Sequence, residues 1–419
     1  MISRRWIIFG ITASLFLMSL FYRASSAIIA PNLVHDLKLS HEALGLLGAA
    51  FFYSFALVQI PLGFFLDRAG PRISMAVFNF IAVAGAVIFA GASGVPGGVI
   101  GRALLGLGMA GNLMGPLKLF TNWFDPRKFA TLSGLFISLG TVGSLAATSP
   151  LAIMVEAIGW RGSFYALAGL HCVLTICLVI IVRDIPSGKI TSSIAQETPL
   201  FPSSFTSLRA LFSNWSYWAI SLSTFLRYGA YASIQALWVG PFLIEFLGLS
   251  PITAGNLILM LSIGLILGAP FGGMLSDRIL RSRKRAIIIG LSISSVTILS
   301  FSQWESTTHL AMLGSLLFVI GFFNSFGQIV YAHIKELMPA DMSASAMTGV
   351  NFFTMMGGGV FMHLLGGVMQ YMGTNYTNAA EGYKVSFLIC FAAFFLATTL
   401  YFTTKDPVML RRSKGEEAR

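Results

Sequence analysis

Acidic side chains are scarce in this sequence, and so is charge of either sign. Asp, Glu, Lys and Arg make up only 10% of the 419 residues, and none of the 16 acids lies clearly inside one of the long apolar runs. A carboxylate buried in a membrane is a common proton relay. Its absence here disfavours a simple carboxylate-based relay within the membrane.

Cysteine is also rare, which bears on disulfides and metal sites. Cys172, Cys177 and Cys390 all lie inside apolar segments, where we expect small buried apolar residues rather than disulfides or metal ligands. The sequence has no HExxH zinc pattern, no nucleophile elbow and no phosphate-binding P-loop. We therefore expect neither an enzyme nor a bound cofactor or metal.

Long apolar runs dominate the chain, in which 56% of the residues are hydrophobic. The runs have about the 20 residues that a helix needs to cross a bilayer core. No small-residue cleavage site follows the first run, so we expect a retained helix rather than a signal peptide. Twelve membrane helices are predicted, at about 6–30, 43–66, 73–92, 98–122, 128–154, 162–183, 215–243, 251–274, 285–303, 309–333, 345–371 and 384–403.

One segment of the sequence occurs twice, with its landmarks 210 positions apart. The first copy runs from Pro31 to Arg68 and the second from Pro241 to Arg278. A hydrophobic chain of two parallel halves is typical of a secondary transporter whose halves rock about a central site. The expected fold class is all-α, with twelve transmembrane helices in two pseudo-symmetric halves. The predicted parts are 1–183 and 214–404 for the halves, 184–213 for a cytoplasmic linker and 405–419 for a cytoplasmic tail.

Basic residues lie mainly on the side of the N-terminus. The opposite side has only Lys38, Arg161 and Lys384, so the positive-inside bias predicts a multi-pass protein of the inner membrane with both termini in the cytoplasm. The net charge of +11 is spread over short loops, which disfavours nucleic-acid binding. Since one chain can enclose its own pathway, we expect a monomer in the lipid bilayer.

The loop between predicted helices two and three carries a distinctive motif. An acid at a helix end can cap a neighbouring helix, and arginines can pair with acids, so the motif could act as a latch in one conformation. The alternative is a basic loop that only sets topology. The candidate latch residues are Gly63, Asp67, Arg68, Gly70 and Arg72, and in the second copy Gly273, Asp277 and Arg278.

Four cations fall within apolar spans: Arg23, Arg102, Lys118 and Arg227. An arginine near a helix centre costs roughly 2.5–3.5 kcal/mol on insertion scales, so it normally faces an aqueous cavity. Because no acid accompanies these cations, an anionic substrate is indicated, and the arginine fork suits carboxylate or phosphate. Arg227 is the best candidate, because a polar stripe continues its helix face through Tyr231, Gln235 and Trp238.

Other polar residues in the spans are weaker candidates. Asn324 and Gln328 in predicted helix ten and Asn351 in helix eleven could line a cavity, although small polar residues also join helices. His171 and Glu156 are candidates for proton coupling, while a neutral hydrogen-bonded histidine is the simpler interpretation.

These motifs resemble the major facilitator superfamily over most of the chain, from about 6 to 404. The Gly63–Arg72 loop is similar to its signature between helices two and three, and Arg102-x-x-x-Gly106-x-Gly108 to its second common motif. The resemblance implies alternating-access transport, with Arg102 in a structural or coupling role.

Two branches of that superfamily are nearest in pattern. Tyr22-Arg23 before Pro31, and Leu226-Arg227-Tyr228-Gly229, resemble the organophosphate:phosphate antiporters, in which an arginine of helix one and another of helix seven grip the phosphate. Those roles would fall to Arg23 and Arg227. Gln59 stands where those antiporters have a lysine, and Gln59-Ile60-Pro61 is similar to the anion:cation symporters.

The expected function is transport of a small organic anion, such as a sugar phosphate, sugar acid or carboxylate metabolite. Protons or a counter-anion are the coupling partners left open. An amino-acid or small-peptide transporter is an alternative, since a carboxylate suits the same arginines. A drug or siderophore exporter and a non-transporting sensor are further alternatives, although the chain has no buried acid and only a short tail after 404.

Overall fold

The computed structural model describes residues 4–125, 129–186, 211–303, 309–339, 342–375 and 379–406. Every regular element within these ranges is a helix. Ten of the helical segments are long and apolar enough to cross a membrane, and Leu132–Ala146 is a shorter apolar helix. Predicted helix seven is not among them, because its first part carries Arg227 and several hydroxyl side chains.

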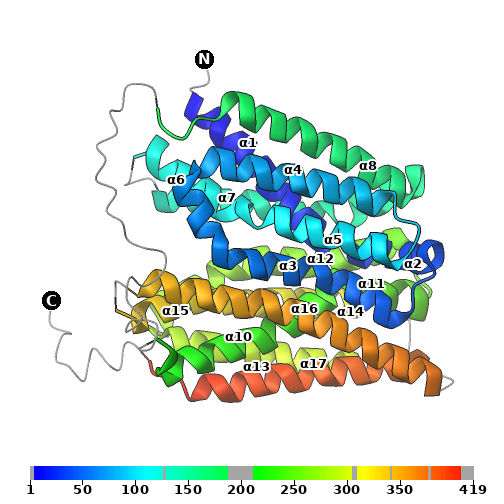
Figure 1. Cartoon of the computed structure of the whole chain (residues 1–419). Helices are drawn as coiled ribbons and strands as arrows, with labels where there is room; N and C mark the ends of the chain where they lie inside the picture. Colours follow the sequence, from blue (N-terminus) through cyan, green and yellow to red (C-terminus); the bar gives the residue numbers. More distant parts are fainter. Residues whose placement is uncertain are drawn as a thin grey trace. The chain divides into compact units, whose positions relative to one another are not determined.

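The chain divides into two compact units, Met1–Ser193 with Gln235–Asn256, and Ile194–Ile234 with Leu257–Arg419. The predicted boundaries at 183 and 214 follow the sequence repeat instead, and they stay a prediction. In the first unit α4 and α8 lie side by side (Figure 1). Its main helices are α1 Arg4–Ala24, α2 Ser26–Leu37, α3 His41–Arg68, α4 Gly70–Ala90, α5 Val95–Met109, α6 Gly111–Trp123, α7 Phe129–Ala146, α8 Ser149–Ile181 and α11 Val239–Pro241.

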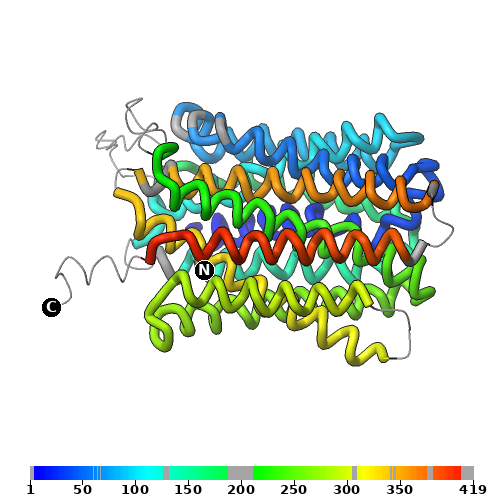
Figure 2. Tube along the Cα trace, turned by 90° about the horizontal axis from the view of Figure 1, so that it is seen from below, coloured from blue at the N-terminus to red at the C-terminus, as the bar shows by residue number. Residues whose placement is uncertain are grey.

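In the second unit α10 packs against both α16 and α17, as Figure 2 shows in green, orange and red. Short π and 3-10 turns interrupt the long helices at η4 Leu275–Ile279 and η5 Ser325–Ile329. The main helices of this unit are α10 Trp215–Ser233, α12 Pro251–Met274, α13 Arg283–Phe301, α14 Leu310–Asn324, α15 Val330–Leu337, α16 Ser343–Asn375 and α17 Ala379–Phe402. The first residues of α12, up to Asn256, belong to the first unit.

Predicted helix one is divided into α1 and α2 at Ser25. The backbone N–H of Ser25 keeps its helical bond to the carbonyl of Phe21, and its hydroxyl donates to the carbonyl of Tyr22 at 3.1 Å. Further along, Pro31 has no N–H, so it cannot donate to the carbonyl of Ala27. Gly240 of α11 packs on that carbonyl, since a Cβ at Gly240 would lie 1.6 Å from it.

Predicted helices five and six, 128–154 and 162–183, correspond to α7 and α8. Helix α7 stops at Ala146, and α8 begins at Ser149 and continues through a kink at Gly159, where φ is 71°. Glycine adopts this left-handed conformation without a steric penalty. The kink divides α8 into two helices, so its first part belongs to predicted helix five, after a short turn at 147–148, and its second part is predicted helix six.

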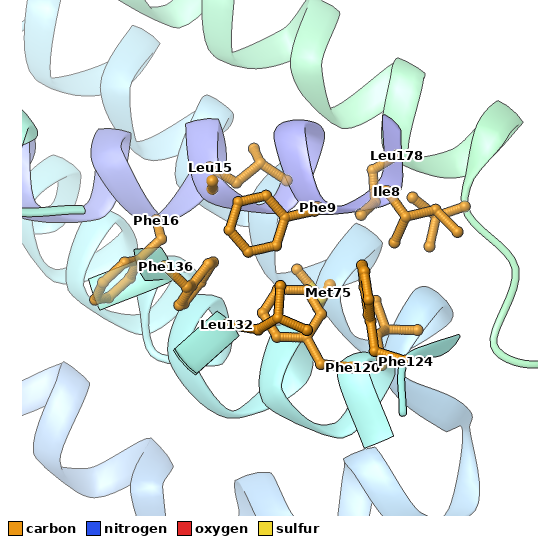
Figure 3. Packing of buried hydrophobic residues seen from close by; sticks show 13 residues of the cluster. Ile8, Phe9, Leu15, Phe16, Met75, Phe120, Phe124, Leu132, Phe136 and Leu178 are labelled. Atoms are coloured by element: carbon orange, nitrogen blue, oxygen red, sulfur yellow. The ribbon is translucent and has the colours of Figure 1, made fainter. Parts of the chain in front are cut away.

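Aromatic rings form a packed cluster in the first unit. Phe9 stacks on Phe120 with centroids 5.2 Å apart, and Phe16 stacks on Phe136 at 4.8 Å. Figure 3 shows these rings joining α1 to α6 and α7, with Met75 of α4 beneath them. Offset and edge-to-face ring pairs add about 0.5–1.5 kcal/mol each beyond burial. This cluster therefore fixes α1, the helix that carries Arg23.

Candidate functional site

Arg227 lies buried in α10, with 7% of its surface exposed. Its Nη1 donates to the side-chain oxygen of Asn324 at 3.0 Å and to the backbone carbonyl of Asn324 at 3.2 Å. The guanidinium lies against Gly327 of η5, where a Cβ would come within 2.3 Å of Cζ. A side chain larger than glycine at 327 would displace the arginine.

Tyrosines surround this arginine. The Tyr228 ring lies 5.9 Å from its Cζ, and Tyr231, Tyr331 and Tyr401 interact with it electrostatically. The Tyr331 hydroxyl donates to Asn351 at 2.9 Å, which places a second predicted residue next to this group. Gln328, by contrast, is exposed. The predicted face of helix ten thus has a buried Asn324 on the arginine and an exposed Gln328.

Arg23 and Arg102 lie near one another at the break in helix one. Arg102 is fully buried, and its Nη1 donates to the carbonyl of Tyr22 at 2.8 Å. Its Cζ lies 5.1 Å from the Phe51 ring, and the Cζ of Arg23 lies 4.9 Å from the Phe55 ring. Both rings belong to α3. Because Arg102 donates to the carbonyl of Tyr22, it holds the backbone next to Arg23 in place.

The outer part of the predicted polar stripe belongs to the first unit. Trp238 is buried and its ring lies 6.4 Å from that of His41, while Gln235 is half-buried. Gln59 is buried on α3 at 8% exposure. Tyr231, in the second unit, is buried at 2%. Of the stripe that the sequence places on one helix, Tyr231 therefore belongs to the second unit, and Gln235 and Trp238 belong to the first.

His171 and Glu156 have different surroundings. His171 is fully buried in α8, and its Nε2 lies 2.8 Å from the side-chain oxygen of Asn79, which exchanges hydrogen bonds with Asn112. Glu156 is exposed. Burial disfavours a charged imidazolium at His171, and Glu156 meets solvent directly, so the proton-coupling role of both residues stays a prediction.

The first loop motif is organised by an acid that the sequence analysis did not single out. Gly70 has φ of 78°, and a Cβ there would lie 2.7 Å from an oxygen of Asp184. The other oxygen of Asp184 accepts the backbone N–H of Arg72 at 2.8 Å, and the Arg72 guanidinium donates to the carbonyl of Val179. The side chain of Asp67 lies outside the described residues, and Arg68 is exposed.

The second loop copy uses a different arginine from the one expected. Asp277 pairs with Arg283, which also binds Glu336 at 3.1 Å, whereas Arg278 is exposed. Around Gly273 a Cβ would find open space among the described atoms. Arg283 and Glu336 are the missed residues of this ionic group. No spacing rule links them, since they come from α13 and α15.

The comparison with known proteins decides the family. The model of the Major Facilitator Superfamily matches residues 11–239 and 220–419. The chain belongs to this superfamily.

Two curated relatives in this superfamily are named for organic acids. A probable sulfoacetate transporter of Cupriavidus necator is 25% identical over 76% of this chain and 77% of its own length. A probable L-galactonate transporter of Escherichia coli strain K12 is 26% identical over 79% of this chain and 75% of its own length.

The fold of the superfamily is also seen in solved structures. A bacterial homolog of the human lysosomal transporter Spinster, in an inward-facing and unoccupied conformation, aligns with a TM-score of 0.78 and 16% identity. The alignment covers 96% of this chain and 97% of that one. The prediction of an all-α, twelve-helix membrane protein is thus confirmed, and so is the prediction of a transporter rather than an enzyme.

Proposed function

We propose that this transporter moves a small organic anion across the inner membrane by alternating access, with both termini in the cytoplasm. A carboxylate or sulfonate is the favoured headgroup, because sulfoacetate and L-galactonate are the compounds for which two relatives are named. The basic loops on the side of the N-terminus support the orientation.

The proposal rests on the unused hydrogen-bond donors and the unbalanced charge of the buried Arg227. Within the described residues only its Nη1 donates hydrogen bonds, both to Asn324, and no carboxylate pairs with it. A guanidinium has five N–H donors in a planar fork, and a buried cation normally needs a counter-charge. An anion that takes the remaining donors would satisfy both requirements.

Arg23 is proposed as a second anion-binding residue, next to the helix-one break that Arg102 braces. Tyr231, Gln235, Trp238, Gln59, Asn324 and Asn351 are proposed to shape the pocket. Gln328, which is exposed, is proposed as a further member of this set. The acids and arginines of the two loops are proposed as latches of the transport cycle.

A thermal-unfolding screen in detergent tests the proposal. The compounds are sulfoacetate, L-galactonate, a hexose phosphate, inorganic phosphate, an amino acid and a dipeptide. A ligand that binds only the folded state stabilises it by about 2.7 kcal/mol at one hundred times its Kd. Stabilisation by one anion class, lost in Arg227→Gln and weakened in Arg23→Gln, is expected.

Lys118→Gln is the matched control, because this cation also lies in a span but donates to the carbonyl of Leu66. Its ligand response should equal that of the unmodified protein. Stabilisation by neutral or cationic compounds alone, unchanged in Arg227→Gln, would overturn the anion assignment. It would place the exporter alternative first.

A further inference from the structure

The turn from η4 to α13 contains five basic residues between positions 278 and 285. Two of them are tied to the rest of the second unit. Arg283 pairs with Asp277 and Glu336, and Lys284 donates to two backbone carbonyls at and just after the end of α17. These two cations therefore hold helices together, and their donors are not available to a ligand.

The other three basic residues, Arg278, Arg281 and Arg285, are exposed. Their guanidinium groups make no hydrogen bond or ion pair with any residue that the structure describes. The two acids of the neighbouring ionic group are already paired with Arg283. Guanidiniums so close in the sequence repel one another, and an anion shared between them would remove that repulsion.

The backbone that carries these arginines is fixed by hydrogen bonds. The N–H of Ser282 donates to the carbonyl of Ser276 at 3.1 Å, and the Ser282 hydroxyl accepts the N–H of Arg285 at 3.1 Å. Next to Ser282, Arg281 has φ of 47°, a left-handed conformation that residues other than glycine rarely adopt. The turn thus holds the three Cα atoms in place before a ligand arrives, which lowers the entropy cost of binding.

An exposed apolar surface adjoins the arginines. Ile279, within the turn, is 62% exposed. On α13, Arg285 shares one helix face with the half-buried Ile289 and with Val296, which is 65% exposed. The segment Arg283–Phe301 is long and apolar enough to cross a membrane. An exposed apolar face on such a helix suits lipid chains, and Arg285 lies at the end of the helix, where headgroups begin.

We propose that Arg278, Arg281 and Arg285 bind the phosphate headgroup of an anionic phospholipid whose acyl chains lie along the exposed face of α13. Arginine suits phosphate because its planar fork can donate two parallel hydrogen bonds. A free phosphate compound would meet the same guanidiniums, but only a lipid also covers the apolar residues beside them. The site lies on the side of the membrane proposed to be cytoplasmic, where anionic lipids attract basic segments. It does not depend on which compound is transported.

The test measures the binding of fluorescently labelled phosphatidylglycerol to the purified full-length protein in micelles of an uncharged detergent. Binding should be saturable and should weaken as sodium chloride is added. Arg278→Gln, Arg281→Gln and Arg285→Gln should each raise the Kd by about fivefold, and the triple variant by about a hundredfold. Labelled phosphatidylcholine, which has no net charge, should bind the unmodified protein no more tightly than phosphatidylglycerol binds the triple variant.

Lys335→Gln is the matched control, because Lys335 is another exposed cation of the second unit and lies on α15, outside the turn. Its Kd should equal that of the unmodified protein. Replacing the three arginines by lysine keeps the charge but removes the planar fork, so the Kd should lie between those of the unmodified protein and the triple glutamine variant. Because the three side chains are exposed, the variants should fold, and their unfolding temperatures without lipid check this.

Three results would overturn the assignment. Equal binding of phosphatidylglycerol and phosphatidylcholine would show that no site for an anionic headgroup exists. Equal Kd values for the unmodified protein and the triple lysine variant would show general attraction to a positive surface instead of a built site. Displacement of the labelled lipid by glycerol phosphate, at the same concentration as by unlabelled phosphatidylglycerol, would show that the site takes a free phosphate compound. Each of these results leaves the proposed anion transport standing.

Discussion

Asp184 caps helix α4 from a segment that follows α8, its carboxylate accepting the backbone N–H of Arg72 at 2.8 Å. The same arrangement recurs in the second unit. There Asp406, which follows α17, accepts from Ser282, and Ser282 caps α13 by accepting the N–H of Arg285. In each unit an aspartate that follows a long helix, α8 or α17, therefore fixes the start of another helix, α4 or α13.

We expect Asp184→Ala to destabilise the first unit by about 1–2 kcal/mol. The change removes a helix cap, worth about 0.5–2 kcal/mol, and a negative charge at a helix N-terminus. Thermal unfolding in detergent measures the loss. Asp184→Asn keeps an acceptor oxygen without the charge and should lose less. Equal stability of Asp184→Ala and the unmodified protein would contradict the capping role.

We expect Gly70→Ala to destabilise the protein by about 1–2 kcal/mol from backbone conformation alone, because L-residues are strained at positive φ. The new Cβ would also lie 2.7 Å from Asp184. Gly169→Ala is the control, since it sits on α8 with open space around its Cβ and should be neutral or slightly stabilising. The unfolding temperatures of the two variants test this prediction. A fall in unfolding temperature in Gly169→Ala as large as that in Gly70→Ala would contradict it.

These residues illustrate what the sequence could predict. Arg227, Arg23 and the paired loops were identifiable because a charge in an apolar run and a spaced repeat are local signals. Asp184 was not identifiable from the sequence, because only tertiary packing brings it to the backbone N–H of Arg72. The burial of His333 was not predicted, because predicted helix ten ended at 333, whereas α15 continues to Leu337 and the histidine lies within it.

Arg283 and Glu336 should be coupled by about 0.5–1 kcal/mol in a double-mutant cycle. The pair is only partly buried, with side-chain exposures of 24% and 27%, so solvent screens it. The cycle compares Arg283→Gln, Glu336→Gln and the double variant by thermal unfolding. Arg278→Gln should leave stability unchanged, because Arg278 is exposed. Additive single effects at 283 and 336 would show that the pair contributes nothing.

The Asp36 carboxyl should make stability sensitive to acid. Hydrogen bonds from His35 and Trp160, with the charge of Arg161, lower the pKa of this carboxyl. In the unfolded chain the pKa of an aspartate carboxyl is about 3.9. A lowered folded pKa means that the stabilisation is complete above the unfolded value and is lost as pH falls through the folded one.

Asp36→Asn should therefore be less stable than the unmodified protein at pH 7, and the gap should narrow towards pH 3. Unfolding temperatures across that range test this, with the exposed Glu156→Gln as control. A gap that stays constant with pH would mean that the carboxyl charge does not contribute.

The contact between Gly240 and Ala27 joins the outer part of predicted helix seven to α2. Pro31 leaves the Ala27 carbonyl without a helical donor, and the glycine lets the two backbones meet. Gly240→Ala would force them apart, because its Cβ would overlap a backbone oxygen that cannot rotate away. We expect a lower unfolding temperature, with a loss of about 1–3 kcal/mol.

The variant should also make the outer end of helix one easier to open. A single cysteine placed at the exposed Asn32 reports this by its rate of alkylation, which should rise in Gly240→Ala. Gly367→Ala is the matched control, because it also lies in a long helix but has open space at its Cβ. Unchanged labelling and stability in Gly240→Ala, equal to those of Gly367→Ala, would show that the two helices do not depend on this close approach.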